Sequence, residues 1–197
     1  LPKTIEKIDA SKNGAPLTAT VSPEKDYGIV FNPDVKPTIE IWEDFQCPFC
    51  KFFETAMSSY IEGLVRNKEA NVNYHMTSFL GAESKRAANA AYCAVDEARF
   101  IEFHRALYEV QGTENSGIFS NKNLIEIGKR LGISSPKFES CINENKNGDA
   151  VSKVYASMSK YKVEGTPTVF INGKPWSRSG SEFVLGEFKA AVEAAKQ

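Results

Sequence analysis

Two cysteines separated by two residues constrain this chain more than any other feature. Cys47 and Cys50 stand in the sequence CPFC, after the β-branched and aromatic run TIEIWEDF at 38–45 and before a segment with helical apolar spacing. Pro is favoured at the first position of a helix, because its missing N–H costs nothing there, so we expect a helix to begin at Pro48. The pattern predicts a strand, a short connection and a helix, with the cysteine pair at the junction.

Such a pair can bind a metal, form a structural disulfide or react. A structural zinc site needs four ligands, commonly from two close pairs. A structural disulfide within CxxC would close a very small loop, which constrains the unfolded chain least. The other candidate zinc ligands are isolated in the sequence, namely Cys93, Cys141, His75 and His104. We therefore expect no metal, although neither alternative to a reactive pair is eliminated by the sequence.

The reactive interpretation has a physical mechanism. The unpaired N–H groups and the dipole at the start of a helix favour an anion, and a thiolate is such an anion. We expect Cys47 to be exposed, with a pKa of about 5–7, below the free value of about 8.5. Cys50, one turn further on, is expected to be shielded and placed to attack a mixed disulfide on Cys47.

The rest of the chain divides into segments with different patterns. Residues 1–37 are rich in Lys, Pro, Gly and Ser with two short β-like runs, which predicts an N-terminal arm with a strand or hairpin. Residues 82–162 have helical apolar spacing throughout. Residues 38–81 before this block read as strand–helix–strand, and 163–197 after it as strand–strand–helix, with Ser181 as the expected N-cap of the last helix. We expect an α/β domain of 38–81 and 163–197 that carries an inserted helical domain.

Composition argues against two classes of function, nucleic-acid binding and membrane-spanning proteins. The chain has 197 residues and a formal net charge of −1, so it offers no basic field for nucleic acid. No stretch approaches the roughly 20 consecutive apolar residues of a membrane span. The sequence begins at Leu1 instead of Met, which is compatible with a targeting or anchoring segment that has been removed.

The CPFC motif after a strand, joined to GTPT at 165–168, resembles the thioredoxin superfamily and, more closely, the DsbA-type thiol–disulfide oxidoreductases. The resemblance covers residues 38–196. Pro167 stands 120 positions after Cys47, which leaves room for the helical domain that this family inserts. The resemblance implies a cis Pro167 that faces the cysteine pair, and a Thr166 backbone presented to an incoming extended peptide. The alternative for Pro167 is an ordinary trans residue at the start of an edge strand.

The active-site motif departs from DsbA in two ways. Phe49 stands where DsbA has His, so we expect a less stabilised thiolate and a less oxidising disulfide. Thioredoxin-like proteins often bury an acid six residues before the first cysteine, and that position here is Ile41. Glu43 and Asp44 are nearby acids, and the sequence leaves open whether they relay protons, carry surface charge or cap a loop.

Cys93 and Cys141 lie on two predicted helices of the insertion. They are either two buried free thiols or a disulfide that joins the helices, and we expect the disulfide. In the chain-entropy model a bond that closes a loop of this size contributes about 4 kcal/mol. A disulfide would also place the protein outside the reducing cytosol, and some DsbA-like proteins carry a second disulfide in this domain.

The resemblance implies an extracytoplasmic enzyme, in the periplasm or at the outer face of the cell membrane. It would introduce disulfides into reduced, unfolded exported proteins through Cys47 and Cys50, with Thr166 and Pro167 beside them and Pro48 and Phe49 completing the motif. A membrane enzyme of DsbB or vitamin K epoxide reductase type would re-oxidise it. We expect a monomer without a cofactor. The alternatives are a disulfide isomerase or reductase of the same fold and a non-catalytic peptide-binding chaperone.

Overall fold

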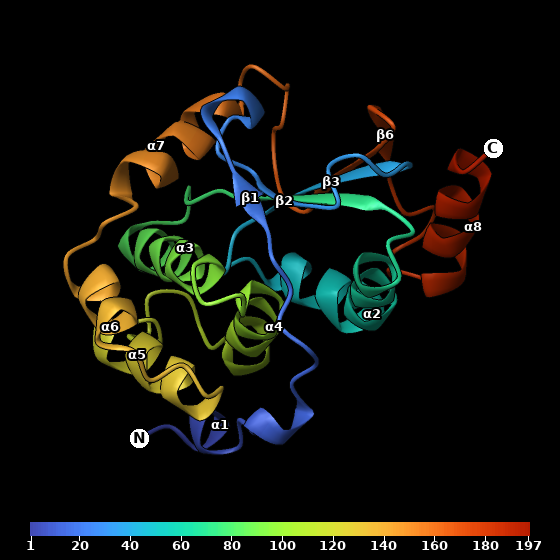
Figure 1. Ribbon diagram of the computed structural model, residues 1–197. Helices are drawn as coiled ribbons and strands as arrows, with labels where there is room; N and C mark the ends of the chain where they lie inside the picture. The colour runs from blue at the N-terminus through green and yellow to red at the C-terminus, as the bar shows by residue number, and fades with distance from the viewer.

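The computed structural model describes residues 1–197 and contains one six-stranded sheet (Figure 1). The strands follow the order β1-β2-β4-β3-β5-β6, in which β3 and β4 are parallel and all other neighbours antiparallel. Their bounds are Thr20–Val21 (β1), Ile29–Phe31 (β2), Thr38–Glu43 (β3), Asn71–Met76 (β4), Thr168–Ile171 (β5) and Lys174–Trp176 (β6). The central place of β3 explains its β-branched and aromatic sequence, because both of its edges are paired.

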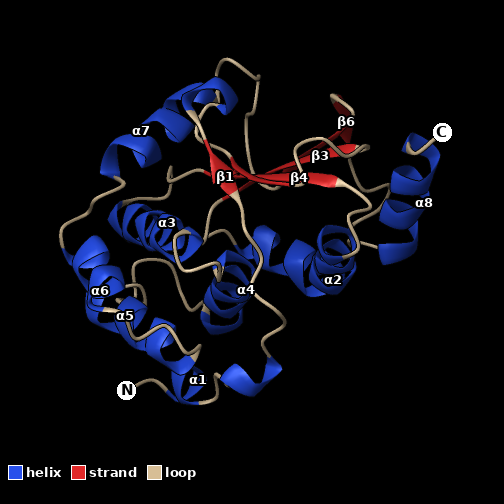
Figure 2. Cartoon of the chain, in the orientation of Figure 1, coloured by secondary structure: helices blue, strands red, loops and turns tan.

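The helices fall into two groups along the chain. Five of them, α3 to α7, lie between β4 and β5 in sequence and form the inserted helical domain, which Figure 1 shows in green to orange. Figure 2 shows α2, α3 and α4 below the strands, with α8 at the C-terminal end. Their bounds are Lys3–Glu6 (α1), Pro48–Arg66 (α2), Ala82–Val95 (α3), Phe100–Val110 (α4), Asn121–Arg130 (α5), Pro136–Asn143 (α6), Gly148–Ser157 (α7) and Leu185–Ala195 (α8). None of these helices is long and apolar enough to cross a membrane.

The helical domain shares its core with the sheet. The buried apolar residues form one continuous cluster that runs from β2 and β3 into α3, α4 and α6. Phe45, which follows β3, packs against Tyr108 of α4 and Phe119. Burial of this much apolar surface across the junction stabilises both parts together. The end of β3 is therefore held firmly against the insertion.

Several local expectations differ from the structure. The predicted strands at 38–45 and 71–79 are shorter, ending at Glu43 and Met76. Ser181 does not cap the last helix, because α8 begins at Leu185 and Val184 is its N-cap. The preceding loop is held differently, since the Glu187 carboxylate accepts hydrogen bonds from the N–H (3.1 Å) and hydroxyl (2.6 Å) of Ser179.

The N-terminal arm contains more than a strand or hairpin. It begins with α1, whose Ile5 is fully buried. Asn13 then donates a hydrogen bond to the Leu131 carbonyl (2.9 Å), and the N–H of Leu17 donates to the Ala98 carbonyl (3.2 Å). The arm thus lies along the helical domain before β1 and β2 extend the sheet.

Candidate active site

Cys47 and Cys50 lie at the start of α2. Cys47 is the N-cap and Pro48 the first helical residue, as the helix-start pattern predicts. Cys50 is fully buried and Cys47 is 7% exposed. Cys47 is thus the more exposed of the two, as expected, but it is far less exposed than the sequence suggested. Both are free thiols. A partner can reach this site only through the small exposed part of Cys47.

The two thiols have opposite acidities. A hydrogen bond from the Cys50 thiol, with smaller contributions that include the N–H groups of Phe49 and Cys50, lowers the pKa of Cys47 to about 6 against the opposing effect of burial. Burial, and next the hydrogen bond to Cys47, raises the pKa of Cys50 well above its ordinary value. The sequence attributed the acidity of Cys47 to the helix end, whereas the Cys50 thiol contributes more. At neutral pH the site therefore holds one thiolate, on Cys47.

Thr166 and Pro167 lie beside Cys47. The antiparallel pairing of β3 with β5 brings the start of β5 to the end of β3. The Thr166–Pro167 peptide bond is cis. The Thr166 carbonyl oxygen is 3.5 Å from Cys47 Sγ and accepts a hydrogen bond from it when Cys47 is protonated. Two segments far apart in the sequence thus meet at the reactive sulfur.

A small pocket opens next to these residues. Its volume is about 200 Å³, and Arg178 is the one charged side chain that lines it. The Arg178 guanidinium lies over the Phe183 ring (4.4 Å) and the Phe49 ring (5.4 Å). Phe49 is 50% exposed and the neighbouring Phe52 58%. An exposed aromatic surface beside a reactive thiol is suited to contact with a polypeptide. The lining residues are Phe49, Thr166, Pro167, Val169, Trp176, Ser177, Arg178 and Phe183.

Asp44 holds the loop before Cys47. It is fully buried, which eliminates surface charge among the roles that the sequence left open for this residue. Its carboxylate accepts hydrogen bonds from the Ser84 hydroxyl (2.6 Å) and from the N–H groups of Gln46 (2.9 Å) and Leu80 (3.1 Å). Burial raises the pKa of Asp44 in spite of these bonds. Asp44 is therefore a loop cap, which was one of the alternatives that the sequence left open.

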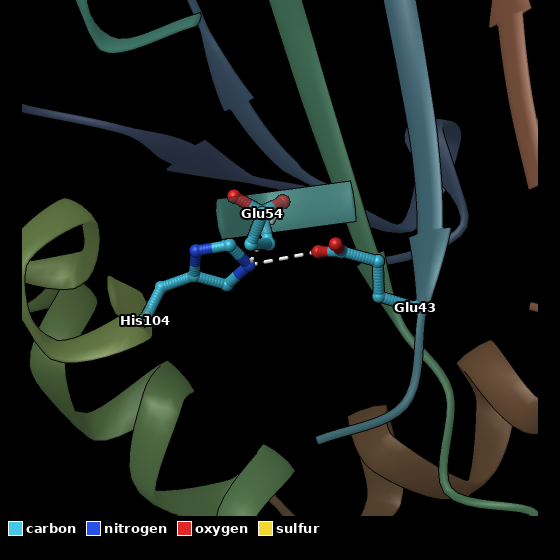
Figure 3. Close-up of side chains that lie close together, drawn as sticks. All are labelled: Glu43, Glu54 and His104. Carbon is cyan, nitrogen blue, oxygen red and sulfur yellow. Dashed lines mark hydrogen bonds and ion pairs between the residues drawn. The ribbon is translucent and has the colours of Figure 1, made fainter. Parts of the chain in front are cut away.

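Glu43 lies in a buried cluster with two residues that the sequence analysis did not connect to the site. Figure 3 shows His104 reaching from α4 toward Glu43 at the end of β3, with Glu54 of α2 beside them. His104 Nε2 is 2.8 Å from Glu43 Oε1 and 3.9 Å from Glu54 Oε1. Burial raises the pKa of Glu43 to about 8, raises that of Glu54 and lowers that of His104. Of these residues, only Glu54 could have been connected to the site from the sequence, because it stands one helical turn after Cys50.

Gln111, just after α4, is a second contact that sequence reasoning missed. Its side-chain amide donates hydrogen bonds to the Phe45 carbonyl (2.7 Å) and the Cys47 carbonyl (3.0 Å). His75, by contrast, lies apart from the cysteine pair. It is buried in β4 and stacks on Trp42, with 4.3 Å between the ring centres.

Cys93 and Cys141 form a disulfide that joins α3 to α6 across 48 residues of sequence. The side-chain amide of Asn147 lies 3.3 Å from the sulfur of Cys141 and 3.5 Å from that of Cys93. The N–H of Asn147 donates to Asn89 of α3 (2.8 Å). The disulfide and Asn147 thus fasten the turn between α6 and α7 to α3.

The fold and the site together define a protein of the thioredoxin class in its DsbA-type form. Its marks are a CxxC at the start of a helix, a cis-proline beside it and a helical insertion in the sheet. A family model described as Thioredoxin matches residues 27–192. The chain belongs to this family.

Two solved structures from Mycobacterium tuberculosis illustrate the similarity. DsbA in its reduced form is 28% identical, with a TM-score of 0.70 over 92% of each chain. The disulfide bond oxidoreductase DsbG, also reduced, is 26% identical, with a TM-score of 0.70 over 98% of this chain and 92% of that one. Both comparisons extend across the helical insertion.

The chain also matches segments of larger curated proteins. It is 25% identical over 180 residues to the Na⁺/H⁺ antiporter NhaA 1 of Salinispora arenicola, which is 91% of this chain and 26% of that protein. It is 28% identical over 160 residues to the serine/threonine-protein kinase PknE of M. tuberculosis, which is 73% of this chain and 28% of that protein. The chain thus spans about a quarter of the length of these relatives.

Proposed function

We propose that this protein is a thiol–disulfide oxidoreductase that introduces disulfides into exported proteins through Cys47 and Cys50. The observation that carries the proposal is the asymmetry of the pair. The pKa of Cys47 is lowered to about 6 and the pKa of the fully buried Cys50 is raised. A low-pKa thiolate is a good leaving group in disulfide exchange, and its stability favours the reduced enzyme, so the disulfide is a better oxidant.

The reaction begins from the Cys47–Cys50 disulfide. A substrate thiolate attacks Cys47 Sγ, a new S–S bond forms, and the Cys47–Cys50 bond breaks with its electron pair on Cys50, which takes up a proton. A second substrate thiolate then attacks the substrate sulfur of the mixed disulfide, and Cys47 leaves as a thiolate. The substrate loses two electrons, and the enzyme disulfide is reduced to the dithiol. The low pKa of Cys47 favours its departure as a thiolate from the mixed disulfide.

Thr166, Pro167 and the adjoining pocket would hold the substrate. Thr166 already contacts the reactive sulfur, and the pocket continues from it to the exposed ring of Phe49. An unfolded segment can lie there in extended form, with backbone groups near residue 166 and apolar side chains on the aromatic rings. We assign Cys47 and Cys50 the covalent chemistry, and Thr166 and Pro167 substrate contact.

The proposed setting is extracytoplasmic, in the periplasm or at the outer face of the cell membrane. The Cys93–Cys141 disulfide supports it, because such bonds persist in oxidising compartments. Each turnover leaves a reduced dithiol, so an oxidant is required. We propose a membrane enzyme of DsbB or vitamin K epoxide reductase type, which passes two electrons to a quinone, and we expect the enzyme to act as a monomer.

Two assays and one equilibrium measurement test the proposal. We expect the pure protein to oxidise a dithiol peptide quickly, to rescue a scrambled-disulfide protein poorly, and to have a potential above the roughly −270 mV of thioredoxin. Efficient rescue with poor peptide oxidation would indicate an isomerase, and a potential at or below that of thioredoxin would indicate a reductase. A peptide-binding chaperone would show no fast-reacting thiol of low pKa.

A further inference from the structure

We infer that Glu43, Glu54 and His104 form a binding site for one divalent transition-metal ion, with Zn²⁺ as the representative ion. The inference concerns metal binding alone and stands independently of the proposed exchange activity. No metal was expected from the sequence, because the candidate ligands are isolated in it. The fold brings together one imidazole and two carboxylates, whose nearest ligand atoms all lie within 4.8 Å of one another (Figure 3).

The two carboxyl groups of this cluster hydrogen-bond to each other and have no salt-bridge partner except His104. Beyond that shared bond, both oxygens of Glu54 and Oε2 of Glu43 are buried without a hydrogen-bond donor, and the two residues are 3% and 0% exposed. A buried polar group without a partner costs about 1–3 kcal/mol, and more when it is charged. Native proteins rarely keep three such atoms together without an explanation. A cation placed among the three residues would give these oxygens a partner.

The distances between the ligand atoms suit coordination of one metal ion by all three residues. Two ligand atoms at about 2.1 Å from one metal stand about 3.0 Å apart at octahedral angles and about 3.4 Å apart at tetrahedral angles. The observed distances from His104 Nε2, 2.8 Å to Glu43 and 3.9 Å to Glu54, lie on either side of these values. Binding requires a shift of a few tenths of an ångström and loss of any proton on Nε2 and on the two carboxyl groups. Each ligand comes from a different element, so β3, α2 and α4 all hold the site.

The donor set indicates the class of metal. Imidazole nitrogen with carboxylate oxygen suits Zn²⁺, Mn²⁺ and Fe²⁺, whereas Ca²⁺ takes six to eight oxygen ligands. Three protein ligands leave at least one position for water. The cluster offers no thiolate, which separates it from any metal that Cys47 and Cys50 could bind as a pair.

An entry route lies next to the cluster. Glu54 and Tyr108 line a surface pocket of about 580 Å³, which is large enough for a hydrated ion. The pocket carries the carboxylates of Glu54, Glu62 and Glu109 against the cations Lys51 and Arg105. Glu62 is already paired with Arg66 and Arg105. Glu54 is therefore the acid that links this pocket to the buried cluster.

The experiment uses protein in which the Cys47–Cys50 disulfide is formed, so that these thiols cannot bind the probe. Titration with ZnCl₂ in a calorimeter should show one Zn²⁺ per chain. Glu54→Gln keeps the shape but removes the charge, and should weaken binding at least about tenfold, since even outer-shell changes commonly cost 10–100-fold. Glu109→Gln is the matched control, because Glu109 is exposed in the same pocket, and it should bind as the wild type does.

A second measurement keeps the inference testable if Glu54→Gln does not fold. X-ray absorption of the zinc-loaded wild type should show only nitrogen and oxygen neighbours at about 2.0–2.2 Å, with one imidazole and no sulfur at about 2.3 Å. Absence of binding, a sulfur shell, or equal affinity in Glu54→Gln would overturn the metal site. The cluster would then be a set of buried groups that share protons.

Discussion

Replacing Cys50 with Ala tests what makes Cys47 acidic. The pKa of Cys47 is lowered to about 6, and the first cause is the hydrogen bond from the Cys50 thiol. At about 1.4 kcal/mol per pKa unit, the difference of about 2.5 from the free value of about 8.5 corresponds to about 3.5 kcal/mol in favour of the thiolate. A hydrogen bond to a charged group contributes about 1.5–3 kcal/mol. Cys50→Ala should therefore raise the pKa of Cys47 by about 1–2 units, to about 7–8.

The assay is the rate of alkylation by iodoacetamide as a function of pH. Cys93 and Cys141 are bonded, so Cys47 is the single free thiol of the variant. Cys50→Ser is the matched control, because its hydroxyl can still donate to the thiolate, and its pKa should stay closer to that of the wild type. A pKa that remains near 6 in Cys50→Ala would refute the reasoning, since the helix N–H groups would then suffice.

The same pKa sets a contribution to the redox potential. At pH 7 a thiol of pKa about 6 is about 90% ionised, whereas a free thiol of pKa about 8.5 is about 3% ionised. This difference stabilises the reduced protein by about 1.4 kcal/mol, or about 30 mV for a two-electron couple. The lowered pKa makes this contribution fade as the pH falls through about 6. Reduction takes up one proton when Cys47 is ionised and two when it is not, so the slope of the potential against pH should steepen from about 30 to about 59 mV per pH unit as the pH falls through about 6. A slope that does not change in this range would contradict the assignment of the thiolate to Cys47.

Three further predictions concern the surroundings of the cysteine pair. Phe49→His should raise the potential by about 30 mV in glutathione equilibration, if a nearby imidazolium lowers the pKa of Cys47 by about one unit, and an unchanged potential would count against it. Double replacement of Cys93 and Cys141 by Ala should reduce the free energy of unfolding in denaturant by about 4 kcal/mol and leave exchange activity intact, whereas lost activity at unchanged stability would refute a structural role. Arg178→Ala should slow oxidation of dithiol peptides with an acidic residue beside the cysteine by up to about fivefold, the size of an exposed ion pair, and neutral peptides should be unaffected.

The sequence predicted those parts of the fold that depend on the backbone preferences of single residues, such as helix starts and turns. Pro48 marks the start of α2, because its ring suits the first helical position and would disrupt the interior of a helix. The Asn172–Gly173 turn between β5 and β6 follows from the tolerance of both residues for positive φ, and both have it. The ends of the strands were placed less well. Whether residues after Glu43 remain in a strand depends on Asp44, whose carboxylate turns the chain by binding Gln46, Leu80 and Ser84.

The surroundings of the cysteines were harder to predict, because they come from distant segments. Glu43, Glu54 and His104 gather from three elements, and nothing in the spacing of their positions indicates that they meet. A His within an apolar helix is commonly an ordinary core residue. The exposure of Cys47 was overestimated for a similar reason, since its sulfur contacts Thr166, which is more than a hundred positions away in the sequence.

Three polar residues on or just beyond α4 explain why the insertion belongs to the site. His104, Tyr108 and Gln111 are spaced i, i+4 and i+7, so they lie on one face of the helical turns that carry them. His104 binds Glu43, and the Tyr108 hydroxyl donates to the Asp44 carbonyl at 3.1 Å. Gln111 completes the series with its bonds to the carbonyls of residues 45 and 47. One face of α4 and the residue just beyond it thus contact the chain at residues 43, 44, 45 and 47, from the end of β3 to the reactive cysteine. Through these bonds the insertion helps to position the thiol at the start of α2.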